Sequence, residues 1–177
     1  MTFSRAVSTL SVPDLMLMRR VQRWSPPRWV RWWMIAATRG GDGWLWALAG
    51  ICVLSSSDRL RYAAFGAAFM AVACGILLFR ILKKLVGRRR PCDIEPNCWC
   101  QLLPPDQFSF PSGHSITAFA VAVSLGMFYP AFFAILLFYA ASVAISRVVL
   151  GMHFVSDVLA GSALGAALGY CSFLLVS

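Results

Sequence analysis

The sequence predicts an all-α, integral membrane helical bundle of five to six transmembrane helices with an interfacial helix at its amino end. Of its 177 residues, 59% are hydrophobic and only 13% are charged, which is far more apolar than an ordinary soluble domain. A soluble fold with so little charge would expose large apolar patches to water. A helical bundle can instead turn those surfaces toward lipid, because each helix satisfies its own backbone polar groups.

Five apolar segments are the candidate membrane helices. They cover residues 43–56, 60–82, 114–129, 130–146 and 154–176. Because a span takes about 20 residues, the first, third and fourth are short and are expected to use flanking residues or a thinner bilayer. In the last segment, small residues recur at every fourth position, which allows another helix to approach closely. These residues are Gly161, Gly165 and Gly169.

The amino-terminal part differs from the rest, and the sequence predicts two units: an interfacial segment, 1–41, and a transmembrane core, 42–177. Tryptophans and arginines are interspersed through the first unit, a pattern typical of helices at headgroup depth. Arginines also interrupt its first apolar stretch, so no cleavable signal peptide is expected. This segment either supplies a sixth core helix or lies flat on the membrane.

The charge and cysteine patterns restrict the possible partners. The formal charge is +9 and the basic residues lie between the apolar segments, which suits anionic headgroups or phosphate. Nucleic acid is not an expected partner, because the charge forms no stripe interleaved with aromatics on a polar domain. Cys92, Cys98 and Cys100 share one polar connection without a second Cys/His cluster, so no metal site is predicted. A disulfide there requires an oxidising compartment.

The chain contains only two histidines, His114 and His153, and each borders an apolar segment. Asp157 follows His153 by four residues, a spacing that on a helix places the carboxylate against the imidazole. Such a carboxylate orients the ring as the acid of a hydrolase triad does. His153 is therefore the predicted nucleophile toward phosphorus. Asp157, the only acid within the five segments, needs a partner there, and His153 is the nearest candidate.

The second histidine belongs to the run Pro111-Ser112-Gly113-His114, which opens an apolar helix. A helix start offers free backbone amides and a positive dipole end, so an anion fits there. Ser112 either caps the helix or donates to a phosphate oxygen, and Gly113 lets the backbone approach closely. His114 is placed to protonate the leaving group.

Three cationic residues complete the predicted phosphate site. Lys83, Arg90 and Arg147 supply positive charge for a phosphoryl group whose oxygens carry the developing charge, and arginine forks match phosphate geometry. Within the run of three arginines, Arg88 and Arg89 are interpreted as a topology anchor. Arg90 differs because the following proline restricts its backbone.

The spacings resemble the type 2 phosphatidic acid phosphatase superfamily. The matching motifs are Lys83-x6-Arg90-Pro91, Pro111-Ser112-Gly113-His114 and Ser146-Arg147-x5-His153-x3-Asp157. All eleven specified positions are filled in order, and they include both histidines of the chain. The resemblance implies a six-helix core, catalysis without metal or cofactor, a phosphohistidine at His153 and His114 as acid. The implied phosphate-binding residues are Lys83, Arg90, Ser112, Gly113 and Arg147.

A membrane lipid phosphatase in a bacterial inner membrane is the function that follows from this resemblance. Its expected substrates are undecaprenyl diphosphate, phosphatidic acid or phosphatidylglycerol phosphate. The hydrophobicity disfavours the soluble haloperoxidases and acid phosphatases of the same superfamily. A non-enzymatic transporter or anionic-lipid-binding protein is the alternative, and turnover distinguishes it. The charge bias predicts a cytoplasmic site, whereas the resemblance and the loop cysteines favour an extracytoplasmic one, which we expect.

Overall fold

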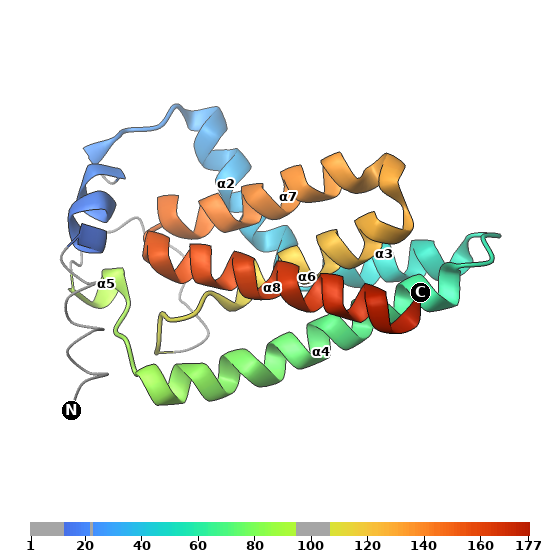
Figure 1. Cartoon of the computed structure of the whole chain (residues 1–177). Helices are drawn as coiled ribbons and strands as arrows, with labels where there is room; N and C mark the ends of the chain where they lie inside the picture. Colours follow the sequence, from blue (N-terminus) through green and yellow to red (C-terminus); the bar gives the residue numbers. More distant parts are fainter. Residues whose placement is uncertain (1–12, 22, 95–106) are drawn as a thin grey trace.

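Helices make up the regular structure of the described part of the chain. The computed structural model describes residues 13–21, 23–94 and 107–177, and within them the only strand-like feature is an isolated bridge between Arg89 and Phe108. Residues 13–21 are helical. The named helices are α2 (Arg28–Gly40), α3 (Trp44–Ser55), α4 (Arg61–Val86), α5 (Pro91–Ile94), α6 (Gly113–Phe128), α7 (Pro130–Val149) and α8 (Val155–Val176) (Figure 1). The all-α prediction is confirmed for these residues.

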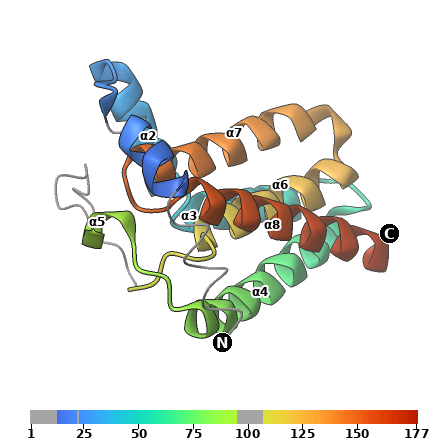
Figure 2. The ribbon, with the colours of Figure 1, turned by 60° about the vertical axis from the view of Figure 1, so that its left-hand side comes forward.

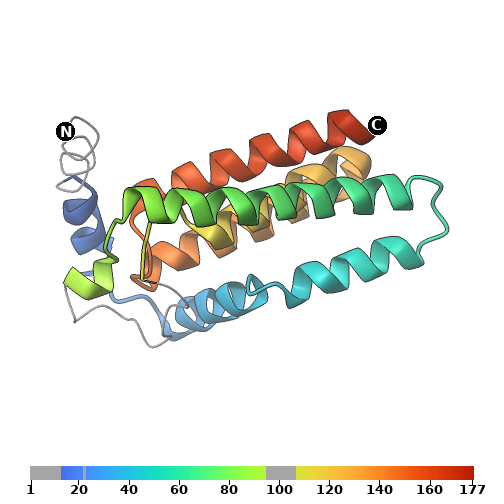
Figure 3. The same ribbon diagram turned by 90° about the horizontal axis from the view of Figure 1, so that it is seen from below.

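Helix α6 is the centre of the bundle and packs against α4, α7 and α8. Its inner positions are mostly alanine, serine and glycine, and such small side chains let several helices approach one helix at once. Two clusters of buried apolar side chains form around it, one with α7 and one with α4. By contrast, α3 has no buried residue and lies to one side of the bundle, where it continues the course of α2 (Figure 3).

The glycine stripe of α8 lies against the backbone of α6, as its spacing predicts. A Cβ at Gly161 would lie 2.6 Å from the Ser112 carbonyl oxygen, and one at Gly169 would lie 2.6 Å from the Ala120 carbonyl oxygen. Gly165 makes the same kind of approach to Ile116. The atoms in the way are backbone atoms, which cannot rotate aside. The two helices therefore depend on glycine at these positions.

Substituting Gly169 with alanine is expected to destabilise the bundle by about 1–3 kcal/mol, because the added methyl group forces α6 and α8 apart. Gly66 of α4 is the matched control, since a Cβ there meets nothing within 4 Å. Gly66→Ala is expected to be neutral or to stabilise by about 0.5–1 kcal/mol, since alanine favours helix more than glycine does. Thermal unfolding in detergent measures both. Equal effects at the two positions would contradict the packing account.

Three helices are long and apolar enough to cross a membrane among the described residues: α4, α7 and α8. The apolar helices α3 and α6 are shorter, in agreement with the prediction for the first and third segments. The fourth segment uses flanking residues, as expected, because α7 does not end at residue 146. It continues to Val149 and reaches 20 residues, since the basic residue in its last turn is favourable at the negative end of a helix dipole.

Most of the polar connections gather at one end of the bundle. The end of α4, helix α5, the starts of α6 and α8 and the end of α7 all lie there, together with the helical residues 13–21 (Figures 1 and 2). Helix α2 packs on the same region, where Met34 contacts Leu150 and Met152. The amino-terminal segment therefore touches the core, while its division from the core at residue 41 stays a prediction.

Candidate active site

A cavity of about 680 Å³ opens among α3, α4 and α6 and reaches the polar end of the bundle. Both histidines line it, and so do three predicted phosphate-binding cations, Lys83, Arg90 and Arg147. The rest of its wall is mainly apolar and comes from α3 and α4. These apolar residues include Trp46, Ile51, Leu54, Phe65, Phe69, Val72, Ile76 and Phe79. One end of the cavity is thus cationic, and the remainder suits a hydrocarbon chain.

His153 lies in the loop between α7 and α8 and is only 1% exposed. The chain reverses at Gly151, whose φ of 69° favours glycine. The backbone N–H groups of Met152 and His153 then both donate to the carbonyl of Arg147, at 3.0 and 3.1 Å. This loop therefore fixes the position of the histidine relative to the end of α7.

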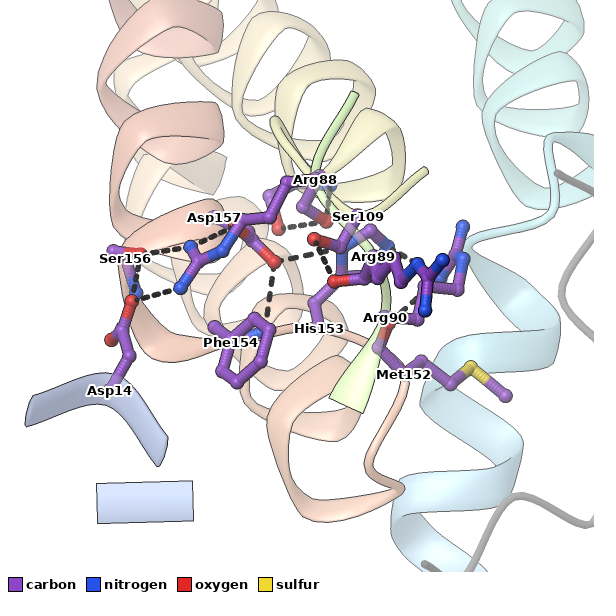
Figure 4. Close-up of polar contacts among 12 residues, drawn as sticks. Asp14, Arg88, Arg89, Arg90, Ser109, Met152, His153, Phe154, Ser156 and Asp157 are labelled. Atoms are coloured by element: carbon purple, nitrogen blue, oxygen red, sulfur yellow. Dashed lines mark hydrogen bonds and ion pairs between the residues drawn. The ribbon is translucent and has the colours of Figure 1, made fainter. Parts of the chain in front are cut away.

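Arg90 holds His153 from the cavity side. Its Nη1 donates to the Met152 carbonyl at 2.8 Å and lies 3.2 Å from Nε2 of His153 (Figure 4). Because a guanidinium only donates, Nε2 must accept, and the neutral ring carries its hydrogen on Nδ1. The lone pair of the predicted nucleophile therefore lies on Nε2, beside an arginine that lines the cavity.

Asp157 lies behind His153, but not through the helical contact that the sequence predicts. Helix α8 begins at Val155, so His153 precedes it, and Asp157 is in its first turn. The carboxylate Oδ2 lies 3.6 Å from Nδ1 of His153 and accepts from the Phe154 backbone N–H at 2.9 Å. The two side chains face each other across the start of the helix. Their separation is longer than a hydrogen bond, and it is close enough for the carboxylate charge to orient the ring.

Arg88 is the main partner of Asp157, and its interpretation as a topology anchor is wrong. Its side chain is 8% exposed, and Nη1 contacts Asp157 Oδ1 at 2.7 Å. Nη2 contacts Asp14 Oδ2 at 2.8 Å, and the guanidinium stacks on the Phe154 ring at 4.0 Å. Asp14 also accepts a hydrogen bond from the Ser156 hydroxyl (Figure 4). A buried ion-pair cluster therefore ties the helical residues 13–21 to the start of α8 (Figure 4).

The start of α6 carries the second histidine, as predicted. Ser112 is the N-cap, and its Oγ accepts from the backbone N–H of Ser115 at 3.4 Å and from the hydroxyl of Ser115 at 2.9 Å. The backbone N–H of Ser112 donates to the Asp157 carbonyl at 3.1 Å, which joins the starts of α6 and α8. His114 points into the cavity, where its Nε2 lies 2.8 Å from the Asp42 carboxylate.

The remaining cations come from two further helices. Arg147 follows the predicted fourth segment, 130–146, and lies in the last turn of α7. It is 3% exposed, and its Nη1 donates to the Thr38 hydroxyl of α2 at 2.7 Å. Lys83 lies in the last turn of α4, is also buried, and its Nζ is 5.4 Å from the centre of the Phe79 ring. Helices α2, α4 and α7 thus converge on one site.

The structure brings most of the predicted site residues to the same cavity and leaves two behind it. Those that line it are Lys83, Arg90, Gly113, His114, Arg147 and His153. Ser112 and Asp157 are fully buried and do not line it. Cys98 and Cys100 lie outside the described residues, and Cys92, which is partly exposed, forms no disulfide with another described cysteine. No three described Asp, Glu, His or Cys side chains group as metal ligands.

Sequence reasoning missed several residues that the fold brings to the site or behind it. They are Asp14, Thr38, Asp42, Arg80 and Arg88. One signal was available, because the chain has only seven acidic residues. A carboxylate in so apolar a chain is costly without a partner, and three of the seven, Asp14, Asp42 and Asp157, have partners at this end of the bundle. Nothing in the sequence pattern marks Thr38.

Burial lowers the pKa of the His153 imidazole well below its ordinary value, and the positive charges of Arg147, Arg90 and Lys83 lower it further. Protonation would put a second positive charge into an already cationic, water-poor site. Asp157 opposes this effect little, because its own charge is neutralised by Arg88 at 2.7 Å. In the ligand-free protein the predicted nucleophile is therefore a neutral base.

A histidine titration checks this direction. Because the chain has only two histidines, selective 15N labelling gives signals from two rings, and His114→Gln identifies the pair from His153. A lowered pKa means that protonation occurs at lower pH than in a free histidine, whose pKa is about 6.5. We therefore expect the His153 ring to stay neutral as the pH falls through 6.5 to 5.5 without ligand. Protonation above pH 6.5 would contradict the account of its surroundings.

Comparison with known proteins places this architecture in a family. The model of the PAP2 superfamily matches residues 62–177, the part of the chain that contains both histidines and three clustered cations. This chain belongs to the PAP2 superfamily. The match confirms the resemblance inferred from the motif spacing.

Curated phosphatases resemble the chain over about half to three quarters of its length. It is 36% identical over 144 residues to a decaprenylphosphoryl-5-phosphoribose phosphatase of Mycobacterium tuberculosis, covering 77% of each chain. Over 103 residues it is 40% identical to phosphatidylglycerophosphatase B of Bacillus subtilis, covering 52% of this chain and 48% of that relative. A lipid A 1-phosphatase of Rhizobium johnstonii is 33% identical over 102 residues.

Solved structures of the PAP2 type share the fold. A phosphatidylglycerolphosphate phosphatase from Bacillus subtilis superposes with a TM-score of 0.78 at 24% identity, covering 98% of this chain and 90% of that one. LpxE of Aquifex aeolicus gives a TM-score of 0.77 at 25% identity, covering 90% and 94%. With the apolar helices of the present chain, these relatives make it an integral membrane lipid phosphatase.

Proposed function

We propose that this protein removes the terminal phosphate of a long-chain lipid phosphate or diphosphate through a phosphohistidine at His153. The observation that carries the proposal is the cavity, which has both imidazoles and three cations at one end and apolar walls from α3 and α4 beyond them. A phosphate bound at the cationic end has space for a hydrocarbon chain along those walls. The same cavity therefore suits both parts of an amphipathic substrate.

In the first step, Nε2 of His153 attacks phosphorus. Lys83, Arg90 and Arg147 offset the charge that the phosphoryl oxygens carry in the transition state. A P–N bond forms, the P–O bond to the lipid breaks, and His114 donates a proton to the departing oxygen. Asp157 keeps the hydrogen of His153 on Nδ1, so that the attacking lone pair remains on Nε2.

In the second step, water replaces the histidine. His114, now neutral, takes a proton from the attacking water. The new P–O bond forms as the P–N bond breaks, and the electron pair of that bond returns to Nε2 of His153. Gly113 brings the start of α6 close to the phosphate, and Ser112 caps that helix with its Oγ, which accepts from the backbone N–H and the hydroxyl of Ser115.

The cations, rather than a metal ion, provide the charge stabilisation in this mechanism. Phosphate release in detergent is therefore expected to persist in EDTA. The substrate panel contains undecaprenyl diphosphate, phosphatidic acid and phosphatidylglycerol phosphate, with decaprenylphosphoryl-5-phosphoribose added because the mycobacterial relative is named for it. A soluble phosphomonoester is the control. We expect a long-chain substrate to exceed the control, with a simple lipid carrier phosphate preferred over a glycolipid.

Two results would contradict this proposal. Loss of turnover in EDTA that added divalent metal restores would contradict metal independence. A kcat/KM for the soluble phosphomonoester equal to that for every lipid would contradict the role of the apolar walls. Lipid binding without any phosphate release would favour an anionic-lipid-binding protein or transporter instead.

We further propose a multi-pass arrangement in a bacterial inner membrane with the site on the extracytoplasmic side and residues 1–41 at the interface. The thiol of Cys92 lies in α5, at the polar end of the bundle. A membrane-impermeant thiol reagent applied to intact cells is expected to label Cys92 in a variant whose other cysteines are replaced by serine. Labelling only after the cells are opened would place the site on the cytoplasmic side.

A further inference from the structure

The turn between α2 and α3 brings a carboxylate to the second histidine. Asp42 lies in this turn between Gly41, which is buried, and Gly43, whose φ is 115°. Its Oδ1 is 2.8 Å from Nε2 of His114, although 72 positions separate the two residues in the sequence. Asp42 is 46% exposed on its side chain and His114 is 18% exposed, so the pair lies at the wall of the cavity and not in the interior of the bundle.

The charge of Asp42 is unusual for its surroundings. Among the described residues that line the cavity, Arg80, Lys83, Arg90 and Arg147 are cationic, and Asp42 is the one carboxylate. A negative charge there opposes the binding of phosphate, so on binding alone its presence is unfavourable. The cations also disfavour a positively charged His114. The Asp42 carboxylate contacts the His114 ring and offsets the repulsion from the cations. His114 is the residue that the mechanism requires to carry a proton.

We propose that Asp42 is a positioning residue for His114, holding the hydrogen on Nε2 and stabilising the imidazolium that protonates the leaving oxygen. The inference rests on the proposed function, in which His114 is the acid. With Nε2–H donated to Asp42, the other ring nitrogen, Nδ1, carries the proton that is transferred. As the P–O bond to the lipid breaks, that proton moves to the departing oxygen, and the neutral ring remains hydrogen-bonded to Asp42. Water gives the proton back in the second step.

Each histidine of the site then has its own carboxylate, in a different arrangement. Asp157 faces Nδ1 of His153 from the first turn of α8, and Asp42 faces Nε2 of His114 from the α2–α3 turn. The first pair leaves the lone pair on Nε2 of His153. In the second pair, the Asp42 carboxylate offsets part of the burial and of the cationic charge that disfavour a protonated His114. Attack on phosphorus requires a neutral imidazole at His153, and proton donation requires a protonated imidazole at His114.

The competing account is mechanical: Asp42 could simply fasten the α2–α3 turn to α6. The two accounts differ in how the effect of a substitution depends on the leaving group. An alkoxide is a poor leaving group and needs the proton, whereas a nitrophenolate departs without one. Loss of a purely mechanical contact would disturb both reactions equally, because it would move the cavity wall that both substrates share.

The test is therefore single-turnover release of the leaving group by Asp42→Asn, using a long-chain alkyl phosphate and a nitrophenyl phosphate ester. We expect about a 10²-fold loss with the alkyl phosphate, as for a weakened general acid, and less than a tenfold loss with the nitrophenyl ester. His114→Gln should show the same selectivity, and the double variant should be no slower than His114→Gln alone. Asp42→Glu should recover part of the alkyl rate.

Asp58→Asn is the matched control, since Asp58 lies in the turn at the other end of α3 and its carboxylate accepts from the Leu60 backbone N–H at 3.2 Å. It is expected to leave both rates unchanged. Asp42→Ser serves the same purpose as Asp42→Asn if the latter does not fold. Equal losses with both substrates, no loss with either, or additive losses in the double variant would overturn the inference. If the wild type itself releases no phosphate, the proposed function fails instead.

Discussion

Phosphate release by His153→Ala is expected to fall by about 10⁴-fold or more, because the variant has no atom that can attack phosphorus. The loss should appear in kcat, while binding of the lipid phosphate persists, since Lys83, Arg90 and Arg147 remain. The structure supports so large an effect, because the lone pair of His153 lies on Nε2, and Nη1 of Arg90 holds this atom at 3.2 Å. Steady-state phosphate release together with equilibrium binding of the same lipid separates the two quantities.

His114→Ala is the matched comparison for this prediction. It should also lose turnover of the lipid, yet it should still form a phosphoenzyme from a nitrophenyl phosphate, because that leaving group needs no acid. His153→Ala should form none. The adduct is expected to be labile to acid, as a phosphorus–nitrogen bond is. If His153→Ala keeps a rate within tenfold of the wild type, or if the adduct is found on another residue, the nucleophile has been wrongly assigned.

Arg88→Ala is expected to destabilise the protein by about 3–5 kcal/mol, because it leaves buried carboxylates without their positive partner. Arg88 lies between Asp157 Oδ1 at 2.7 Å and Asp14 Oδ2 at 2.8 Å, with Phe154 stacked on its guanidinium. Turnover should fall as well, since Asp157 loses the contact that holds it behind His153. Thermal unfolding in detergent and phosphate release measure the two effects.

The neighbouring residue, Arg89, provides the control. Its side chain is exposed, so Arg89→Ala is expected to change stability by no more than about 0.5 kcal/mol. The combination of Arg88→Ala with Asp14→Asn should be less destabilising than the sum of the two single changes, because one uncompensated charge has been removed. Similar effects for Arg88→Ala and Arg89→Ala would contradict the buried cluster.

Two of the corrections described above have the same local cause. The spacing of His153 and Asp157 fits a helix, and so does that of many residue pairs that are not helical. Gly151 adopts a positive φ, and α8 begins only at Val155, so the histidine lies in a loop. The fourth predicted segment ended just before Arg147, but the end of a helix accepts a basic residue readily. Helix ends are the part of a fold that sequence patterns specify least.

The sequence by itself determined the membrane helices, the helix start at His114, the glycine face of α8 and the residue types needed for phosphoryl transfer. These features follow from composition, spacing and capping within one segment, where neighbours along the chain are neighbours in space. The tertiary structure decided which distant groups meet: Asp42 with His114 over 72 positions, and Thr38 with Arg147 over 109. Spacing fixes the face of a helix on which a residue lies, but not which other helix packs against that face. The positions of Asp14, Asp42 and Arg88 at the site therefore follow only from the tertiary structure.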